Sequence, residues 1–292
     1  MHVTFATDNA YAPLTAVAMY SLCEVVPDVT ITVLADDLDD TAQENLARTL
    51  RNHPDVVLDI VDIADLLAPL ERLPIGGSRT YPRSIWATLF LGSALPGDLR
   101  RTLYLDSDVI VRQDLSGLWD LELDGNVIAA VTDGDDAWSD NSLDDRIAYH
   151  HELGLAPELA YFNSGVLLVD LEAWRRDDIT LRCEQILRRF HDRVIWVDQE
   201  ILNAALAGRW LKVERTWNCM TWWLSADERR PPYDDDLEHA VIRHFAGEDH
   251  KPWADRHRPV PHRDEFIRLA DRTGTTDGRS WVPASHLPLA GG

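Results

Sequence analysis

Strand-like and helix-like segments alternate through the first hundred residues, and this alternation limits the fold more than any other feature of the sequence. Short apolar runs predict four strands, at His2–Thr7, Thr30–Ala35, Val56–Val61 and Thr102–Leu105. Three helices are predicted between them, at Pro13–Val25, Asp40–Arg51 and Ser84–Leu95. Strands connected by helices in this order form a mostly parallel central sheet with helices on both faces. We therefore expect an α/β fold.

Local signals mark where two of these helices begin. Pro13 suits the first turn of a helix, and Thr41 with Glu44 three residues later is a capping-box pattern. The second half of the chain is less regular. It predicts strands at Val127–Thr132, Tyr161–Val169, Trp210–Val213 and Ala240–Phe245, and helices at Thr180–Arg189 and Asp198–Ala207.

The expected organisation is a single domain over residues 1–272, followed by a loose tail over residues 273–292 that is rich in Gly, Pro, Thr and Ser. A further Pro/Gly-rich loop is expected from Leu73 to Pro82. No signal-peptide pattern precedes the first strand, and no apolar run approaches the roughly 18 residues of a membrane span. The three cysteines lie far apart in sequence, which favours isolated thiols and a cytoplasmic protein.

The formal net charge of −22 restricts the partners of this chain. So acidic a surface repels the phosphates of nucleic acid and matches an anionic membrane poorly. We therefore expect neither a nucleic-acid partner nor membrane attachment. A phosphorylated ligand would need a bound cation or a few well-placed Lys and Arg residues.

The sequence Asp106-Ser107-Asp108 follows the apolar run that ends at Leu105. Open α/β sheets bind ligands beyond the carboxyl ends of their strands. On an extended backbone the two aspartates point the same way, and both carboxylates can face one hard divalent cation. The alternative is an Asp-rich turn after a strand.

Two further segments carry polar groups at predicted strand ends. Asp8 and Tyr11 follow the first strand, where they suit hydrogen bonding and stacking with a nucleoside, or alternatively cap the next helix. His244 lies at the end of a later strand as a candidate metal ligand, with Gly247 permitting close backbone approach and Lys251 offering a positive charge to phosphate. An ordinary loop with a satisfied histidine is the alternative for the second segment.

Polar residues also interrupt two apolar stretches. Asn163 lies in an apolar strand, where its amide needs a partner. Asp198 and Gln199 open a predicted helix. Asp198 has the alternative role of N-cap to that helix.

Together these five stretches resemble glycosyltransferase family 8, which includes lipopolysaccharide galactosyl- and glucosyltransferases and glycogenin. The resemblance runs in order from about residue 2 to residue 253. It implies a GT-A fold, a UDP-sugar donor, Mn²⁺ (with Mg²⁺ as a substitute) and transfer of a glucose- or galactose-type hexose with retention of configuration. By resemblance, the metal ligands are Asp106, Asp108 and His244, and the uridine pocket is Thr7, Asp8 and Tyr11, with Ser107 near the ribose. The same resemblance assigns Gly247 and Lys251 to the diphosphate, and Asp133, Asn163, Asp198 and Gln199 to the donor sugar.

The chain departs from the family pattern at two places. Thr88 stands where the family usually has an arginine that helps hold the donor, and Arg83 is the candidate substitute. One extra residue separates Gly247 from Lys251. Gln199 is an amide and hence a poor nucleophile, which favours a front-face mechanism over a covalent intermediate.

Three alternatives to this function stay open on the sequence alone. They are a UDP-sugar-binding relative that has lost turnover, a self-glucosylating protein like glycogenin, and a haloacid dehalogenase-like phosphatase that uses Asp106 and Asp108. The acceptor is a saccharide, a glycolipid or a small natural product. Aromatic residues at Trp217, Trp222 and Trp223 suit such an acceptor or fill a core.

Overall fold

The computed structural model describes residues 1–72, 82–133, 150–155, 159–194, 196–221, 224–225, 228–229, 238–247, 251–253 and 260–273. Residues 73–81 of the predicted loop, residues 274–292 of the predicted tail, Trp222 and Trp223 lie outside the described residues. Thr273, predicted to begin the tail, is instead the last residue of helix α11.

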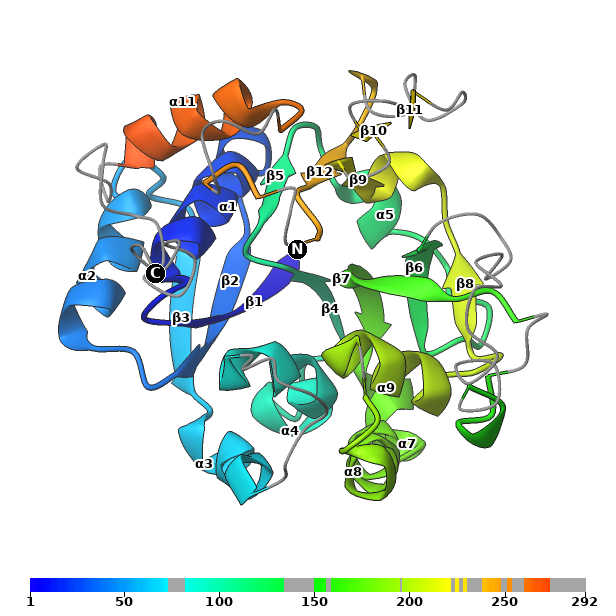
Figure 1. Cartoon of the computed structure of the whole chain (residues 1–292). Coiled ribbons are helices and arrows are strands. Elements are labelled where there is room, and N and C mark those ends of the chain that lie inside the picture. The colour runs from blue at the N-terminus through cyan, green and yellow to red at the C-terminus, as the bar shows by residue number, and fades with distance from the viewer. Residues whose placement is uncertain are drawn as a thin grey trace, which may run out of the picture.

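A seven-stranded sheet in the order β3-β2-β1-β4-β7-β6-β8 forms the centre of the molecule (Figure 1). Every neighbouring pair is parallel except the two that involve β7, which runs antiparallel to both β4 and β6. The predicted α/β fold with a mostly parallel sheet is therefore confirmed. The strands are β1 (His2–Asp8), β2 (Thr30–Asp36), β3 (Val57–Asp62), β4 (Arg101–Leu105), β6 (Ile128–Thr132), β7 (Phe162–Asp170) and β8 (Trp210–Lys212).

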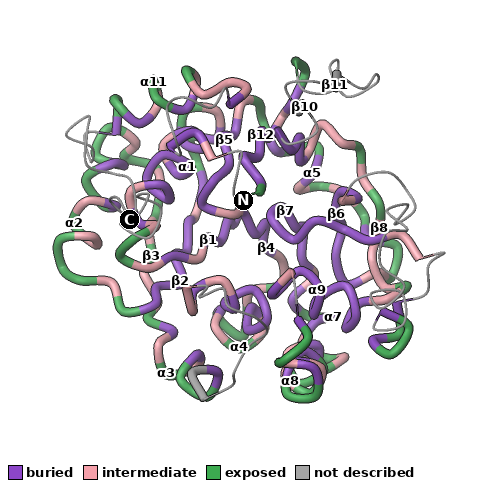
Figure 2. Tube along the Cα trace, in the orientation of Figure 1, coloured by how far each residue is buried: buried purple, intermediate pink, exposed green. Residues whose placement is uncertain are grey.

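Helices cover both faces of this sheet, as the alternating sequence predicts (Figure 1). One face carries α1 (Ala12–Val25), α2 (Asp40–Thr49) and the short α5 (Ser116–Trp119). The opposite face carries α3 (Ala64–Leu67), η1 (Ala68–Arg72), η2 (Arg83–Phe90), α4 (Leu91–Ala94), α7 (Leu171–Arg176), α8 (Ile179–Phe190) and α9 (Val197–Ala205). The strands that these helices cover are largely buried (Figure 2).

Alternation along the strands divides the apolar residues between two cores. Leu103 and Leu105 of β4 pack on the α1 side, whereas Tyr104 packs on the α9 side. Strand β7 repeats the pattern, with Leu168 on the first side and Leu167 on the second. Successive side chains of a strand point to opposite faces, so a sheet covered on both sides needs apolar residues at every position.

A second, small sheet packs beside the carboxyl end of β4. It contains β5 (Val109–Val111), β12 (Ile242–His244) and β9 (Cys219–Met220), with β12 in the middle, antiparallel to β5 and parallel to β9. The 3₁₀ turn η3 (Arg215–Trp217) precedes β9, and a two-stranded ribbon of β10 (Leu224–Ser225) and β11 (Glu228–Arg229) follows it. The chain thus passes from the large sheet to the small one between Leu105 and Val109.

Two local predictions are wrong. The segment predicted as one helix over Ser84–Leu95 is a 3₁₀ helix followed by a single α-helical turn. Its residues are buried nearly all round, from Trp86 to Phe90, so the sequence lacks the one-sided stripe that distinguishes an α-helix. Helix α2 is capped by Asp39, whose side chain accepts a hydrogen bond from Ala42 N at 2.8 Å, and not by the predicted Thr41 capping box.

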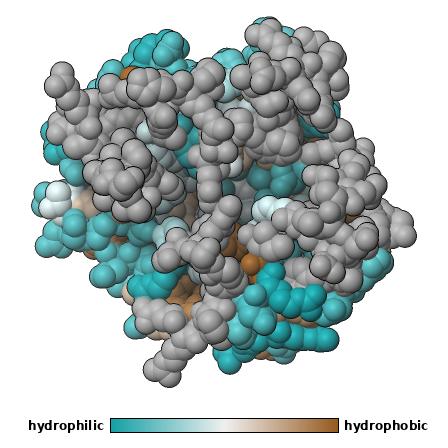
Figure 3. Space-filling view, viewed as in Figure 1, coloured by the Kyte–Doolittle hydropathy of each residue, from teal (hydrophilic) through white to brown (hydrophobic). Residues whose placement is uncertain are grey.

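The described part of the surface seen in Figure 3 is mostly hydrophilic, in keeping with the acidic composition. Hydrophobic residues show there mainly as small areas between other atoms. Among the described helices, none has the length and apolar character needed to cross a bilayer.

Helix α11 (Arg263–Thr273) anchors the segment that carries His244 and Lys251. Its Phe266 is fully buried, with ring centroids 5.6 Å from Phe245 and 5.5 Å from Trp253. We expect Phe266→Ala to lower the free energy of unfolding by about 3–5 kcal/mol, because the cavity removes these contacts. Urea denaturation measures the change.

The neighbouring Ile267 is 36% exposed and provides the matched control. Ile267→Ala should change the free energy of unfolding by no more than about 0.5–1 kcal/mol. Equal losses in the two variants would show that α11 is not held through Phe266.

Candidate active site

Three potential metal ligands meet where the two sheets join. Asp106 N donates to Gly165 O at 2.8 Å, which holds the end of β4 against β7. Phe245 N donates to Asp108 O at 3.0 Å, and the register of β12 on β5 pairs His244 with Val109. These contacts bring one ligand atom from each of Asp106, Asp108 and His244 within 4.8 Å of one another.

The two aspartates converge for a different reason from the one predicted. The expectation of an extended backbone at these positions is wrong, since residues 106–108 leave β4 and pass through a turn into β5. A turn is required because β4 and β5 belong to different sheets. It still directs both carboxylates to His244, whose Nε2 lies 3.2 Å from Asp108 Oδ1 and 3.7 Å from Asp106 Oδ2.

The charges at this cluster fit a divalent cation. Burial raises the pKa of the Asp106 carboxyl, and the nearby charge of Asp108 raises it further. Burial also acts to raise the pKa of Asp108, but the Lys251 ammonium and His244 hold it well below its usual range. Lys251 Nζ is hydrogen-bonded to Asp108 Oδ2. Two carboxylates and an imidazole in a buried site are ligands that a hard divalent cation accepts.

Lys251 therefore reaches the cluster despite the extra residue in its loop. Gly247 begins that loop with φ at +83°, a left-handed conformation that glycine adopts without a Cβ clash. His250, which the sequence also offers as a partial replacement for Lys251, lies outside the described residues.

Gly165 allows strand β7 to approach the cluster closely. A Cβ atom at this position would lie 2.3 Å from His244 Cε1 and 2.6 Å from Asp106 Oδ2. Neither contact is compatible with the van der Waals radii, so any larger residue must displace a ligand. The glycine of this strand is thus required by the site and not by its own backbone conformation.

We expect Gly165→Ala to weaken Mn²⁺ binding about tenfold or more, because both displaced groups are candidate ligands. Electron paramagnetic resonance of free Mn²⁺ measures the affinity. Gly97→Ala is the control, since a Cβ at Gly97 meets no described atom within 4 Å. Unchanged affinity in Gly165→Ala, with circular dichroism showing a folded protein, would contradict the assigned ligands.

A row of hydrogen-bonded side chains lies next to the cluster. Gln199 Nε2 donates to Asp133 Oδ2 at 2.6 Å, and Asn163 Nδ2 donates to Gln199 Oε1 at 3.0 Å. Burial raises the pKa of Asp133. The structure therefore brings together three of the four residues predicted to surround a donor sugar.

Asn203 attaches helix α9, which carries Gln199, to the start of β7. Its Oδ1 accepts from Phe162 N at 2.9 Å, and its Nδ2 donates to Phe162 O at 2.9 Å. Val197, the first residue of α9, has φ at +41°, which is strained for a β-branched residue. The backbone beside Gln199 is thus held in place by specific contacts.

Asp198, the fourth predicted sugar residue, is buried beside Thr88. Trp196 is the N-cap of α9, so the alternative reading of Asp198 as an N-cap is wrong. Thr88 Oγ1 donates to Asp198 Oδ2 at 3.0 Å. Burial, and then the charge of Asp106, raises the pKa of Asp198 to about 7. A threonine at position 88 supplies a hydrogen bond but no positive charge.

Asp198→Asn should stabilise the protein at alkaline pH, because the ionised carboxylate is unfavourable in this buried site. A raised native pKa means that the stability of the unmodified protein falls as pH rises from about 4 to about 7. The gain should therefore be on the order of 2–4 kcal/mol at pH 8 and disappear near pH 4. Urea denaturation of both proteins at several pH values measures it, and a gain independent of pH would contradict the raised pKa.

Hydroxyl groups connect the ends of β1 and β4. Thr15 Oγ1 bonds Thr7 Oγ1 and Ser107 Oγ, both at 2.8 Å, and Ser107 Oγ donates to Ala6 O at 3.0 Å. Thr7 is fully buried and Ser107 nearly so. These side chains therefore fix the position of the strand ends from inside the protein.

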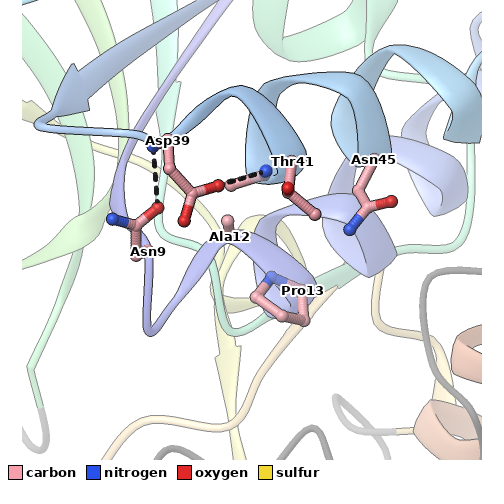
Figure 4. Close-up of a pocket in the computed structure, with 7 residues that line it drawn as sticks. Asn9, Ala12, Pro13, Asp39, Thr41 and Asn45 are labelled. Carbon is pink, nitrogen blue, oxygen red and sulfur yellow. Dashed lines mark hydrogen bonds between the residues drawn. The ribbon is translucent and has the colours of Figure 1, made fainter.

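Asp8 makes two hydrogen bonds at the end of β1. Its Oδ1 accepts from Tyr11 N at 2.9 Å, which turns the chain into α1, and its Oδ2 accepts from Ser84 Oγ at 3.2 Å. The neighbouring Asn9 bonds Asp37 O and Asp39 N across to the next loop. A pocket of about 180 Å³ lies there, between the starts of α1 and α2 (Figure 4).

Arg83, the candidate substitute for the family arginine, is paired with Asp36. Its guanidinium donates to both oxygens of Asp36, at 2.6 and 3.2 Å. Asp36 ends β2, the strand next to β1. The structure thus places Arg83 beside the nucleoside end of the predicted site, while Thr88 faces Asp198.

Sequence reasoning missed Asn218, which is fully buried and bonded to both His244 and Asn163. It also missed the roles of Asn203 and Thr15. A buried amide next to the apolar pair Cys219–Met220 was the available signal for Asn218. Its partners lie 26 and 55 residues away, so no local spacing identifies them.

Comparison with known proteins assigns the family. The family model described as glycosyl transferase family 8 matches residues 2–257. The chain belongs to glycosyltransferase family 8. Membership confirms the resemblance in the sequence and removes the phosphatase alternative.

A similar solved structure confirms the GT-A fold. The galactosyltransferase LgtC, in complex with donor and acceptor sugar analogs, superposes with a TM-score of 0.76 at 28% identity. The match covers 93% of this chain and 95% of that one.

Two curated relatives are similar over shorter segments. General stress protein A of Bacillus subtilis is 31% identical over 183 residues, which cover 60% of each chain. Lipopolysaccharide 1,2-glucosyltransferase of Escherichia coli is 30% identical over 179 residues, which cover 60% of this chain and 51% of that protein. The chain thus matches between about half and three fifths of the length of these relatives.

Proposed function

We propose that this protein transfers a glucose- or galactose-type hexose from a UDP-sugar to an acceptor hydroxyl, with retention of configuration and with Mn²⁺ or Mg²⁺. The observation that carries the proposal is the cluster of Asp106, Asp108 and His244 beside the hydrogen-bonded row of Asn163, Gln199 and Asp133. The first set suits a metal-bound diphosphate, and the second suits the hydroxyls of a sugar. The similarity to LgtC, a galactosyltransferase, and to the Escherichia coli glucosyltransferase supports the hexose class.

The nucleotide half of the donor is assigned to the ends of β1 and β4. Asp8 and Tyr11 are proposed to contact the uridine, with Thr7 and Ser107 supporting the backbone there. Arg83 adds a guanidinium, paired with Asp36, at the same edge of the sheet. The acidic chain thereby retains a basic group near a phosphorylated ligand.

Charge on the departing diphosphate is the main electrostatic problem of the reaction. When the bond from the sugar anomeric carbon to the phosphate oxygen breaks, the electron pair leaves with the diphosphate. A divalent cation held by Asp106, Asp108 and His244 would supply the balancing charge. Lys251 contributes an ammonium, and Gly247 lets the backbone approach the phosphate. When the diphosphate binds, the Lys251 ammonium gives up its hydrogen bond to Asp108 and contacts the phosphate instead.

The hydrogen bonds of Gln199 favour a front-face mechanism. Its Oε1 accepts from both Asn163 Nδ2 and Ser164 N, so neither lone pair is available to attack the sugar. The acceptor oxygen then forms its bond on the face that the diphosphate leaves, and its proton passes to a phosphate oxygen. Asp133 and Gln199 support positive charge on the sugar ring, and Asp198 accepts from its hydroxyls.

The acceptor is proposed to be a saccharide, a glycolipid or a small natural product. A cytoplasmic location is proposed from the three cysteines, which are buried and lie far apart in the sequence. The second candidate is a relative that binds UDP-sugar without turnover. Thr88 favours it, because this side chain offers Asp198 a hydroxyl where an arginine would offer a positive charge.

Thermal unfolding with UDP, GDP, CDP or dTDP, each with and without Mn²⁺, tests the donor and the metal together. We expect stabilisation by UDP only when Mn²⁺ is present, by about 2.7 kcal/mol at a hundredfold excess over the dissociation constant. Asp108→Asn should lose the Mn²⁺-dependent part and stay folded. Incubation with UDP-glucose and UDP-galactose then measures donor hydrolysis and intact-mass shifts.

Each outcome separates the candidates. Stabilisation without hydrolysis or transfer of either sugar favours the inactive relative, and an increase in the mass of the protein indicates self-glucosylation. Preference for another nucleotide would discard UDP. Equal stabilisation of Asp108→Asn and the unmodified protein would contradict the metal site.

A further inference from the structure

Asn218 joins the metal cluster to the row of amides beside it. It lies directly before strand β9, and its side chain is fully buried. Its Oδ1 lies 2.9 Å from His244 Nδ1, and its Nδ2 donates to Asn163 Oδ1 at 2.9 Å. The register of β9 on β12, which pairs Met220 with His244, brings the asparagine to the imidazole.

The direction of these hydrogen bonds is fixed by two backbone amides of β7. Ser164 N donates to Gln199 Oε1 at 3.2 Å, and Gly165 N donates to Asn163 Oδ1 at 3.0 Å. A backbone N–H can only donate a hydrogen bond. The side-chain amides of Gln199 and Asn163 must therefore turn their oxygen atoms, and not their nitrogen atoms, toward these two N–H groups. Asn163 therefore offers its oxygen, not its nitrogen, to Asn218.

The orientation of Asn218 follows from this requirement. Its Nδ2 must face the oxygen of Asn163, which leaves its Oδ1 facing His244. An amide oxygen only accepts, so Nδ1 of His244 must carry a proton. In the neutral imidazole, Nε2 then has its lone pair directed at Asp106 and Asp108, where a cation would bind.

The carboxylates alone would favour the opposite arrangement. Nε2 lies 3.2 Å from Asp108 Oδ1, so a neutral ring without other partners gains a hydrogen bond by carrying its proton on Nε2. A proton there would occupy the position of the metal ligand. The contact to Asn218 opposes this preference, and the two amides of β7 prevent Asn218 from turning over.

We propose that Asn218 is a positioning residue that keeps His244 in the Nδ1–H tautomer and presents its Nε2 to a divalent cation. Strand β7 thus controls the metal site in two ways, through the space left at Gly165 and through the polarity imposed by Ser164 N and Gly165 N. The inference rests on the cation site of the proposed function and is independent of the donor, the acceptor and the transfer step.

Metal binding by substituted proteins, measured without nucleotide, is the first test. Titration with Mn²⁺ followed by electron paramagnetic resonance should show affinity about 10- to 100-fold weaker in Asn218→Ala, as is usual when the partner of a ligating histidine is lost. Asn218→Asp keeps an oxygen acceptor for Nδ1–H but loses the donor to Asn163 Oδ1, so it should recover part of that affinity. Equal weakening in the alanine and aspartate variants, or none in the alanine variant, would overturn the proposal.

Thr221→Val is the matched control. Thr221 is fully buried in the same segment, and its hydroxyl makes no hydrogen bond within the part of the chain that the structure describes. Its replacement should leave Mn²⁺ affinity unchanged. A loss like that of Asn218→Ala would assign the effect to packing of the segment and contradict the positioning role.

The tautomer itself is measurable in the unsubstituted, metal-free protein. Two-bond ¹H–¹⁵N correlation spectra at about pH 9, where a histidine ring is ordinarily neutral, distinguish Nδ1–H from Nε2–H. The His244 signals are assigned by their loss in His244→Gln. We expect Nδ1–H, and an Nε2–H ring would overturn the proposal even if Asn218→Ala fails to fold. If the protein binds no Mn²⁺, the proposed function is contradicted. The tautomer of His244 in the metal-free protein then still tests whether Asn218 positions the ring.

Discussion

Negative charge gathered in a buried site is the constraint on which the rest of the structure depends. Asp106, Asp108, Asp133 and Asp198 all lie around one region, and burial acts to raise the pKa of each. Ionised carboxylates taken out of water need hydrogen bonds or opposite charge. Lys251 and His244 satisfy Asp108, Gln199 satisfies Asp133, and Thr88 partly satisfies Asp198. The same need for positive charge explains why a divalent cation suits the site.

Strand β7 organises the groups that meet this constraint. It runs antiparallel between β4 and β6, and it places three consecutive residues at the site. Asn163 supplies an amide, Ser164 a backbone donor and Gly165 the space for the side chains of His244 and Asp106. Because backbone amides cannot reverse their polarity, this strand sets the direction of the hydrogen bonds that reach Gln199 on one side and His244 on the other.

Both sheets contribute side chains to the site. Parallel strands of the large sheet end together, which brings Asp8, Asp36 and the Asp106 turn to one edge. The small sheet adds His244 and Asn218 from distant parts of the chain, and α11 holds that addition in place through Phe266. Precise placement of functional groups depends on such supporting contacts.

The α/β class, the strands of the central sheet, the family and the aspartate pair could be predicted from the amino-acid sequence, because these depend on local burial patterns and on short motifs. Four features could be seen only in the folded protein: the turn of residues 106–108 between two sheets, the pair of Arg83 with Asp36, the bond of Thr88 to Asp198, and the contact of Asn218 with His244. Each of these contacts joins residues 26 to 110 positions apart, and strand order and register choose the partners. A periodic pattern records which face of an element is buried, but it contains no information about which distant side chain will meet it there.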